Sequence, residues 1–142
     1  MMQVTAGIPE GAAAEKSQVV TEEMTVAWHH PDMPPVFGTP IMIYQMELTA
    51  AAAIENYLPE GWVTVGVVVN VKHLAATPVG ATVTAKARVL SVDGHLITFA
   101  VEAHDGVEKI GEGTHVRAAV EMDRFLKRVN AKARRAGDEG GR

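Results

Sequence analysis

Apolar and polar residues alternate with a period of two through most of the second half of the chain, the pattern of half-buried β-strands. The segments predicted as strands are residues 62–74, 81–91, 95–104 and 107–122. Asp93-Gly94 and Asp105-Gly106 separate the last three, and such dipeptides favour tight turns between antiparallel strands. A weaker alternation over residues 18–28 predicts one earlier strand. The pattern therefore predicts an antiparallel meander.

The first half of the chain contains a long stretch, residues 33–54, with a single charged side chain, Glu47. Thr39 followed by Pro40 is a helix-start signal, because a Thr hydroxyl can cap free N–H groups and Pro suits the first helical position. The predicted helix runs to about residue 57 and ends at a Leu-Pro-Glu-Gly segment. One helix covering one face of a curved sheet buries both apolar surfaces, so we predict an α+β fold.

The length and composition of the chain, 142 residues with 47% apolar and 21% charged, fit one globular domain. We predict that this domain spans residues 1–136 and that residues 137–142 form a disordered polar tail. The end strands of the sheet need a cover or a second subunit, which favours dimerisation. Between Met122 and Val129, apolar residues recur at helical spacing beneath a run of Lys and Arg, which predicts an amphipathic C-terminal helix. Phosphate binding on its basic side is the alternative function.

Glu47 is the first candidate for chemistry. Helical spacing places it on one stripe with Ile43, Ala50, Ala51 and Ile54, which would normally be apolar. A partly desolvated carboxylate is costly, and groups perturbed in this way gather at functional sites. The alternative is a solvated surface Glu on the side of Gln45 and Glu55, and the spacing alone leaves both open.

His73 is the second candidate, at the end of the first long predicted strand. It continues the parity of a series of alternating valines that runs from Val63 to Val71. A period of two places the imidazole on the valine face, beneath the helix and in the same layer as Glu47. A neutral core histidine bonded to the backbone is the alternative. Together with the Thr39 hydroxyl, the pair suits water activation or acyl transfer.

Composition and motifs exclude several other functions. The chain has no Cys, so it has no disulfide, thiol nucleophile or thiolate metal site, in agreement with a reducing cytosol. The histidines show no ligand spacing, and no phosphate loop, dinucleotide fingerprint or nucleophile elbow is present, so we predict no metal and no cofactor. The net charge of −4 does not favour nucleic acid. Without a secretory signal or a membrane span, the sequence predicts a cytoplasmic protein.

Several short strings of this sequence resemble the fluoroacetyl-CoA thioesterase family, and their order and spacing are more specific than any one of them. The strings are Val36-Phe37-Gly38-Thr39, Met46-Glu47, the segment 71–78, Ala103-His104-Asp105-Gly106 and the segment 113–118. The resemblance covers residues 36–129. It implies a hotdog fold, in which an antiparallel sheet wraps a long helix, and a homodimer or a dimer of dimers with active sites at the subunit interface.

The resemblance also implies roles for five residues. The catalytic Thr, Glu and His of the family fall on Thr39, Glu47 and His73, and two substrate-binding residues fall on Gly66 and Arg117. From the residues alone, Gly66 has the alternative of a bulge or a close-packing position, and Arg117 that of an exposed strand residue. Glu47 would attack the thioester carbonyl or activate water, and both routes stay open. Coenzyme A would enter as part of the substrate, with its phosphates near basic residues such as Arg117 or the C-terminal helix.

The sequence departs from the family before the catalytic Thr. The fluoroacetyl-specific enzyme has phenylalanines there that form a gate over the acyl group, whereas this chain reads His29-His30-Pro31-Asp32-Met33. We therefore predict a thioesterase for a short acyl-CoA without selectivity for fluorine. A hydratase of the same fold is disfavoured, because the chain lacks an Asp-x-Asn-Pro-x-His motif. A non-catalytic acyl-CoA binding protein or sensor is the alternative from another class.

Overall fold

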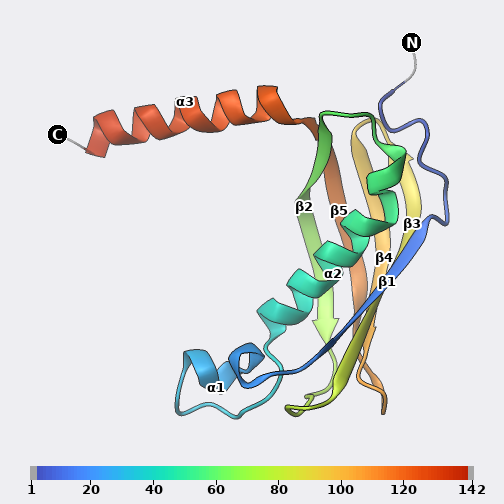
Figure 1. The fold of residues 1–142 in the computed structure, drawn as a ribbon, viewed down its shortest axis with the longest axis vertical. Helices are drawn as coiled ribbons and strands as arrows, with labels where there is room; N and C mark the ends of the chain where they lie inside the picture. The colour runs from blue at the N-terminus through green and yellow to red at the C-terminus, as the bar shows by residue number, and fades with distance from the viewer. Residues whose placement is uncertain (1–2, 141–142) are drawn as a thin grey trace.

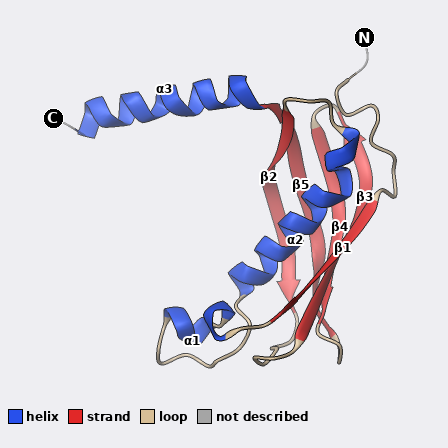
Figure 2. Ribbon diagram, viewed as in Figure 1, coloured by secondary structure: helices blue, strands red, loops and turns tan. Residues whose placement is uncertain are grey.

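The computed structural model describes residues 3–140, in which a five-stranded sheet carries a long helix on one face (Figure 1). The strands are β1 (Ala13–Val19), β2 (Trp62–His73), β3 (Thr82–Asp93), β4 (Leu96–His104) and β5 (Lys109–Glu121). The helices are α1 (Val26–His29), α2 (Thr39–Ile54) and α3 (Met122–Gly140), with short 3-10 turns η1 (Glu22–Met24) and η2 (Glu55–Tyr57). The sheet is antiparallel throughout, in the order β1-β3-β4-β5-β2. Figure 2 shows the helices in blue and the strands of the sheet in red. The predicted α+β fold is confirmed.

The core lies between α2 and the inner face of the sheet. Met42, Met46 and Ile54 of α2 are buried, as are Ile97 and Phe99 of β4. On β3 as far as Val89, and along β4, every second residue is buried, because successive side chains of a strand point to opposite faces. Removal of these apolar side chains from water is the main stabilising term of the domain. Among the described residues, no helix combines the length and apolarity that a membrane span requires.

The first strand differs from the prediction. The segment 18–28 supplies only the last residues of β1 and then forms η1 and α1. The true β1 is an edge strand that pairs with β3 and has the sequence AAEKSQV, most of it exposed. Such a strand lacks a buried face, so its sequence lacks the alternation by which strands are recognised.

A β-bulge in β2 changes which of its side chains face α2. The register against β5 shifts between Gly66 and Val68. Before the bulge, Thr64 and Gly66 lie opposite Ala119 and Arg117; after it, Val69, Val71 and His73 lie opposite His115, Gly113 and Gly111. Directly opposite residues share a face, so His73 is on the α2 side as predicted, whereas Val63 and Val65 are on the outer side. The predicted single series of valines is wrong in its first half.

Two parts of the structure leave apolar side chains exposed. β2 is an edge of the sheet, and Val67, Val68 and Val69 near its middle are 55%, 45% and 44% exposed. α3 extends from the end of β5 away from the sheet (Figure 1), and Leu126 on its apolar side is exposed. The backbone is helical to Gly140, and residues 141–142 of the predicted tail lie outside the described residues.

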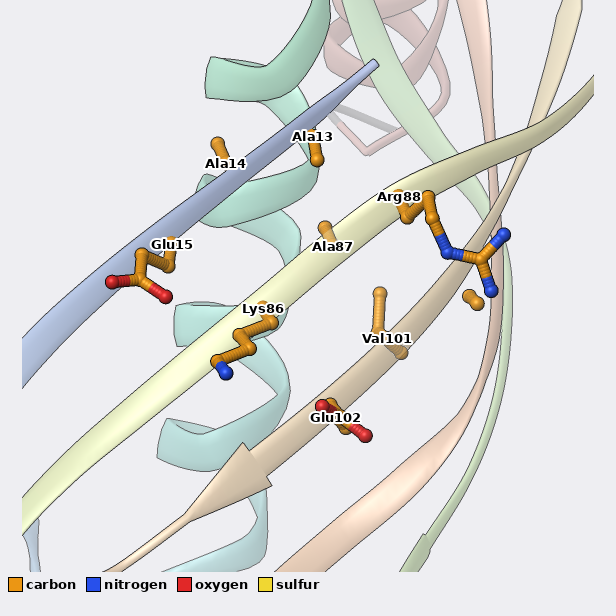
Figure 3. A pocket seen from close by; sticks show the side chains of 9 residues that line it. Ala13, Ala14, Glu15, Lys86, Ala87, Arg88, Val101 and Glu102 are labelled. Carbon is orange, nitrogen blue, oxygen red and sulfur yellow. The ribbon is translucent and has the colours of Figure 1, made fainter. Parts of the chain in front are cut away.

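The outer face of the sheet is polar and carries a shallow cavity of about 440 Å³. Figure 3 shows Glu15, Lys86, Arg88 and Glu102 around it, with α2 behind the strands. None of the residues predicted for catalysis lines this cavity.

Candidate active site

Thr39 and His73 form the first part of the site, where the start of α2 meets the end of β2. Gly38, with extended backbone, precedes α2 and no side chain caps the helix, so the predicted capping role of Thr39 is wrong. The Thr39 hydroxyl instead forms a hydrogen bond of 2.7 Å with Nδ1 of His73. The segment before α2 is fixed because the Phe37 N–H donates to the Thr77 carbonyl. The Thr39 hydroxyl and the His73 imidazole therefore lie together where α2 begins and β2 ends.

The imidazole of His73 is partly buried. Burial lowers its pKa below the ordinary value, against a smaller raising effect of the Ala75 backbone, so the ring is neutral at pH 7. Within residues 3–140, its buried Nε2 has no hydrogen-bond partner. A cavity of about 340 Å³ adjoins the pair, and its remaining lining residues are apolar: Val26, Val36, Phe37, Leu74, Ala75 and Ala76. This cavity is large enough for a small acyl group.

Glu47 belongs to a second part of the site, farther along α2. Its side chain is 32% exposed, and its Oε2 lies 3.6 Å from Nη1 of Arg117. An ideal Cβ at Gly66 would lie 2.6 Å from the same Oε2, so a larger residue there would displace the carboxylate from this position. Glu47 is thus neither fully solvated nor buried in the core. Gly66 has both of the structural roles that the sequence left open. It adjoins the bulge of β2, and it permits the close approach of the Glu47 carboxylate.

Arg117 is buried, so the alternative of an exposed strand residue is excluded. Its Nε and Nη2 donate to the hydroxyl and the carbonyl of Thr64, at 2.9 and 2.8 Å. Its Nη1 lies 3.2 Å from Nε2 of His115. Burial lowers the pKa of Arg117 and Glu47 opposes that shift, but a guanidinium stays charged at any ordinary pH. The fixed cation therefore faces the carboxylate of Glu47.

Thr64 and His115 were not predicted as site residues. Their signal in the sequence is parity: His115 and Arg117 are two residues apart on β5, so they share a face. Thr64 lies opposite Ala119 on the neighbouring strand, on the same face, and the bulge in β2 hides that relation from the sequence. Neither residue could be assigned before the register was known.

The structure joins the predicted residues into two pairs rather than one cluster. Among the described residues, no hydrogen bond or ion pair links Glu47 to Thr39 or His73. Thr39 and Glu47 lie two turns apart on α2, about 12 Å along its axis. Gly66 and His73 lie about 20 Å apart along β2. The predicted contact of Glu47 with His73 therefore does not form within one chain.

Comparison with known proteins assigns the chain to a family. The family model described as "Fluoroacetyl-CoA-specific thioesterase" matches residues 20–123. The chain belongs to this family. A fluoroacetyl-CoA thioesterase of Streptantibioticus cattleyicolor is 42% identical over 101 residues, which cover 71% of this chain and 73% of the relative.

Solved structures agree with the family assignment. A Thr-to-Ser variant of the fluoroacetyl-CoA thioesterase in complex with acetyl-CoA has a TM-score of 0.81 and 36% identity, and the match covers 87% of this chain and 98% of that one. A hot-dog-like protein from Thermanaerovibrio acidaminovorans has a TM-score of 0.83 and 26% identity, with 92% and 97% covered. The protein is thus a thioester hydrolase of the acyl-CoA thioesterase type with a hotdog fold, as the sequence resemblance implied.

Proposed function

We propose that this thioesterase hydrolyses a short acyl-CoA, with Glu47, His73 and Thr39 as its catalytic residues. The observation that carries the proposal is the carboxylate of Glu47, which is held against Gly66 and faced by the buried guanidinium of Arg117. A partly exposed carboxylate of this kind can attack a thioester or activate water for that attack.

We further propose that two subunits complete each active site. The exposed valines of the β2 edge favour pairing with a second copy, because an unpaired apolar edge strand is a template for another strand. If two β2 strands pair antiparallel about their middle near Val69, the Gly66 end of one strand meets the His73 end of the other. Glu47 of one subunit would then face Thr39 and His73 of its partner, and two equivalent sites would result.

The chemistry follows from these positions. Either water attacks the thioester carbonyl directly, or Glu47 attacks it and water then cleaves the mixed anhydride that forms on Glu47. In both routes the C–S bond of the thioester breaks. The leaving CoA thiolate takes up a proton, and the acyl group departs as the free acid. The Thr39 hydroxyl orients the nucleophile or donates to the developing oxyanion, while neutral His73 accepts and returns a proton. Because Arg117 faces Glu47, we propose that it lies near the reacting end of the substrate. The CoA phosphates would then bind surface cations such as those of α3.

The lining of the cavity beside Thr39 favours a small apolar acyl group. No charged side chain lines it, and none of its lining residues comes from the loop 30–35, where the phenylalanine gate of the fluoroacetyl-specific enzyme has no counterpart. Selectivity for one small acyl group over another is set by the shape of such a pocket. We therefore propose that the enzyme accepts several short acyl groups and does not select for fluorine.

The first test is release of CoA thiol from a panel of thioesters that runs from acetyl-CoA and fluoroacetyl-CoA to an aromatic acyl-CoA. We expect turnover of the short members, with fluoroacetyl-CoA not preferred beyond its greater intrinsic reactivity. The matched control is the spontaneous hydrolysis of each thioester in buffer. Tight binding of the panel without turnover of any member would favour the binding-protein alternative and contradict the proposal.

A further inference from the structure

His115 is buried, polar and not used in the mechanism above. It lies on β5 with 1% of its surface exposed, two residues before Arg117. Phe99 of β4 stacks against its ring, with ring centroids 6.2 Å apart and planes at 28°. A core position of this kind would usually hold an apolar side chain, because a buried polar group costs free energy unless it is hydrogen-bonded. Its two ring nitrogens therefore need partners.

Both partners are present, and together they fix the protonation of the ring. Nδ1 lies 2.7 Å from the carbonyl oxygen of Val68, at the bulge of β2. A carbonyl can only accept, so Nδ1 carries the proton and Nε2 carries the lone pair. Nη1 of Arg117 lies 3.2 Å from that Nε2, and a guanidinium can only donate. The two contacts thus require the same neutral tautomer.

The electrostatic surroundings also favour the neutral ring. Burial lowers the pKa of His115, the Val68 carbonyl raises it, the charge of Arg117 lowers it and Glu47 raises it, with the lowering effects prevailing. A proton on Nε2 would point at the guanidinium and break the hydrogen bond. His115 therefore acts as an acceptor and not as a catalytic acid.

We propose that His115 is a positioning residue of the thioesterase site, which holds Nη1 of Arg117 so that the guanidinium faces the carboxylate of Glu47. Thr64 accepts from the other two nitrogens of Arg117, so the bond from Nη1 to His115 completes the set of acceptors that holds the planar guanidinium in place. The bulge between Gly66 and Val68 thus both leaves space for Glu47 and presents the carbonyl that orients His115. This inference rests on the proposed role of Glu47.

Substitution of His115 by asparagine or by glutamine tests the acceptor Nε2 separately from the donor Nδ1. His115→Asn keeps a donor near Nδ1 but has nothing at the position of Nε2, whereas His115→Gln extends an amide oxygen to that position. We expect His115→Asn to lower kcat about 10- to 100-fold with KM little changed, because a buried Arg117 donor loses its acceptor. We expect His115→Gln to stay within about threefold of the parent kcat. Thermal unfolding of both variants checks that the fold is kept.

A double-variant cycle with Arg117 separates positioning from a structural role. In an Arg117→Lys background no guanidinium needs to be held, so His115→Asn should have little further effect on kcat. An equal loss in both backgrounds, or a parental kcat for His115→Asn, would overturn the proposal. If the His115→Asn variant unfolds, His115→Phe takes its place in the same cycle. Phenylalanine keeps an aromatic ring packed on Phe99 but lacks the acceptor Nε2. Full activity of Glu47→Gln would instead refute the proposed function, so the two failures are distinguishable.

Discussion

Mixing two inactive variants, His73→Ala and Glu47→Gln, is expected to restore hydrolysis. If each site combines Glu47 of one subunit with Thr39 and His73 of the other, a mixed dimer has one site with both changes and one intact site. Random exchange of equal amounts should therefore give about one quarter of the parental activity, because half of the dimers are mixed and each has one working site. Co-expression with two different tags, followed by purification of the mixed dimer, makes the measurement, and the purified mixed dimer should have about half of the parental activity.

The control for this experiment is a chain that carries both substitutions, mixed with the parent protein. In that dimer the two changes fall in different sites, so both sites are damaged and no activity beyond that of the parental homodimer is expected. Restoration in the first mixture and not in the second would support a composite site. Activity in the second mixed dimer, with none in the first, would show that each site lies within one chain.

The second large effect is expected from Gly113→Ala, which should strongly destabilise the fold. A Cβ at this position of β5 would lie 2.1 Å from the carbonyl oxygen of Asn70 and 2.6 Å from Cα of Val71. Both atoms belong to the backbone of β2, so they cannot move aside as a side chain would. Overpacking of this kind should lower the free energy of unfolding by about 3 kcal/mol or more.

Chemical denaturation followed by circular dichroism measures this loss, and Thr114→Ala is the matched control. Thr114 is the next residue of β5 and is exposed, so its change should alter the free energy of unfolding by about 0.5 kcal/mol or less. If Gly113→Ala unfolded at the same denaturant concentration as the parent, the register of β5 against β2 in the structure would be wrong.

Much of the fold was predictable because its signals are local. The Thr-Pro start of α2 and the Asp-Gly turns that follow β3 and β4 depend on neighbouring residues alone, and the four strands lie where they were predicted. The predicted four-strand meander is wrong for β2, because β2 crosses over to pair with β5 and only β3, β4 and β5 follow one another in the sheet. β1 was misplaced because an exposed edge strand has no apolar face to mark it. The bulge at Gly66 was not predictable as such, because it depends on the pairing of β2 with β5.

The site was predictable in part, and for a similar reason. Thr39, Glu47 and His73 stood out by helix position, isolated charge and strand parity, and the resemblance gave them roles. The capping role of Thr39 failed because its hydroxyl reaches a partner from β2, distant in the sequence. Thr64 and His115 became visible only through their contacts with Arg117. The contact that we propose between subunits leaves no signal in the periodicity of one chain.

The most direct test of the proposed chemistry is the turnover number of Glu47→Gln with the best substrate of the panel, measured beside its affinity for that substrate. Glutamine keeps the size of the side chain but can neither attack the thioester nor accept a proton from water. We predict a fall in kcat of about 10³-fold or more with binding retained, and no change for Glu55→Gln, an exposed carboxylate just beyond the end of α2. A Glu47→Gln enzyme as active as the parent would contradict the assignment of the chemistry to this carboxylate.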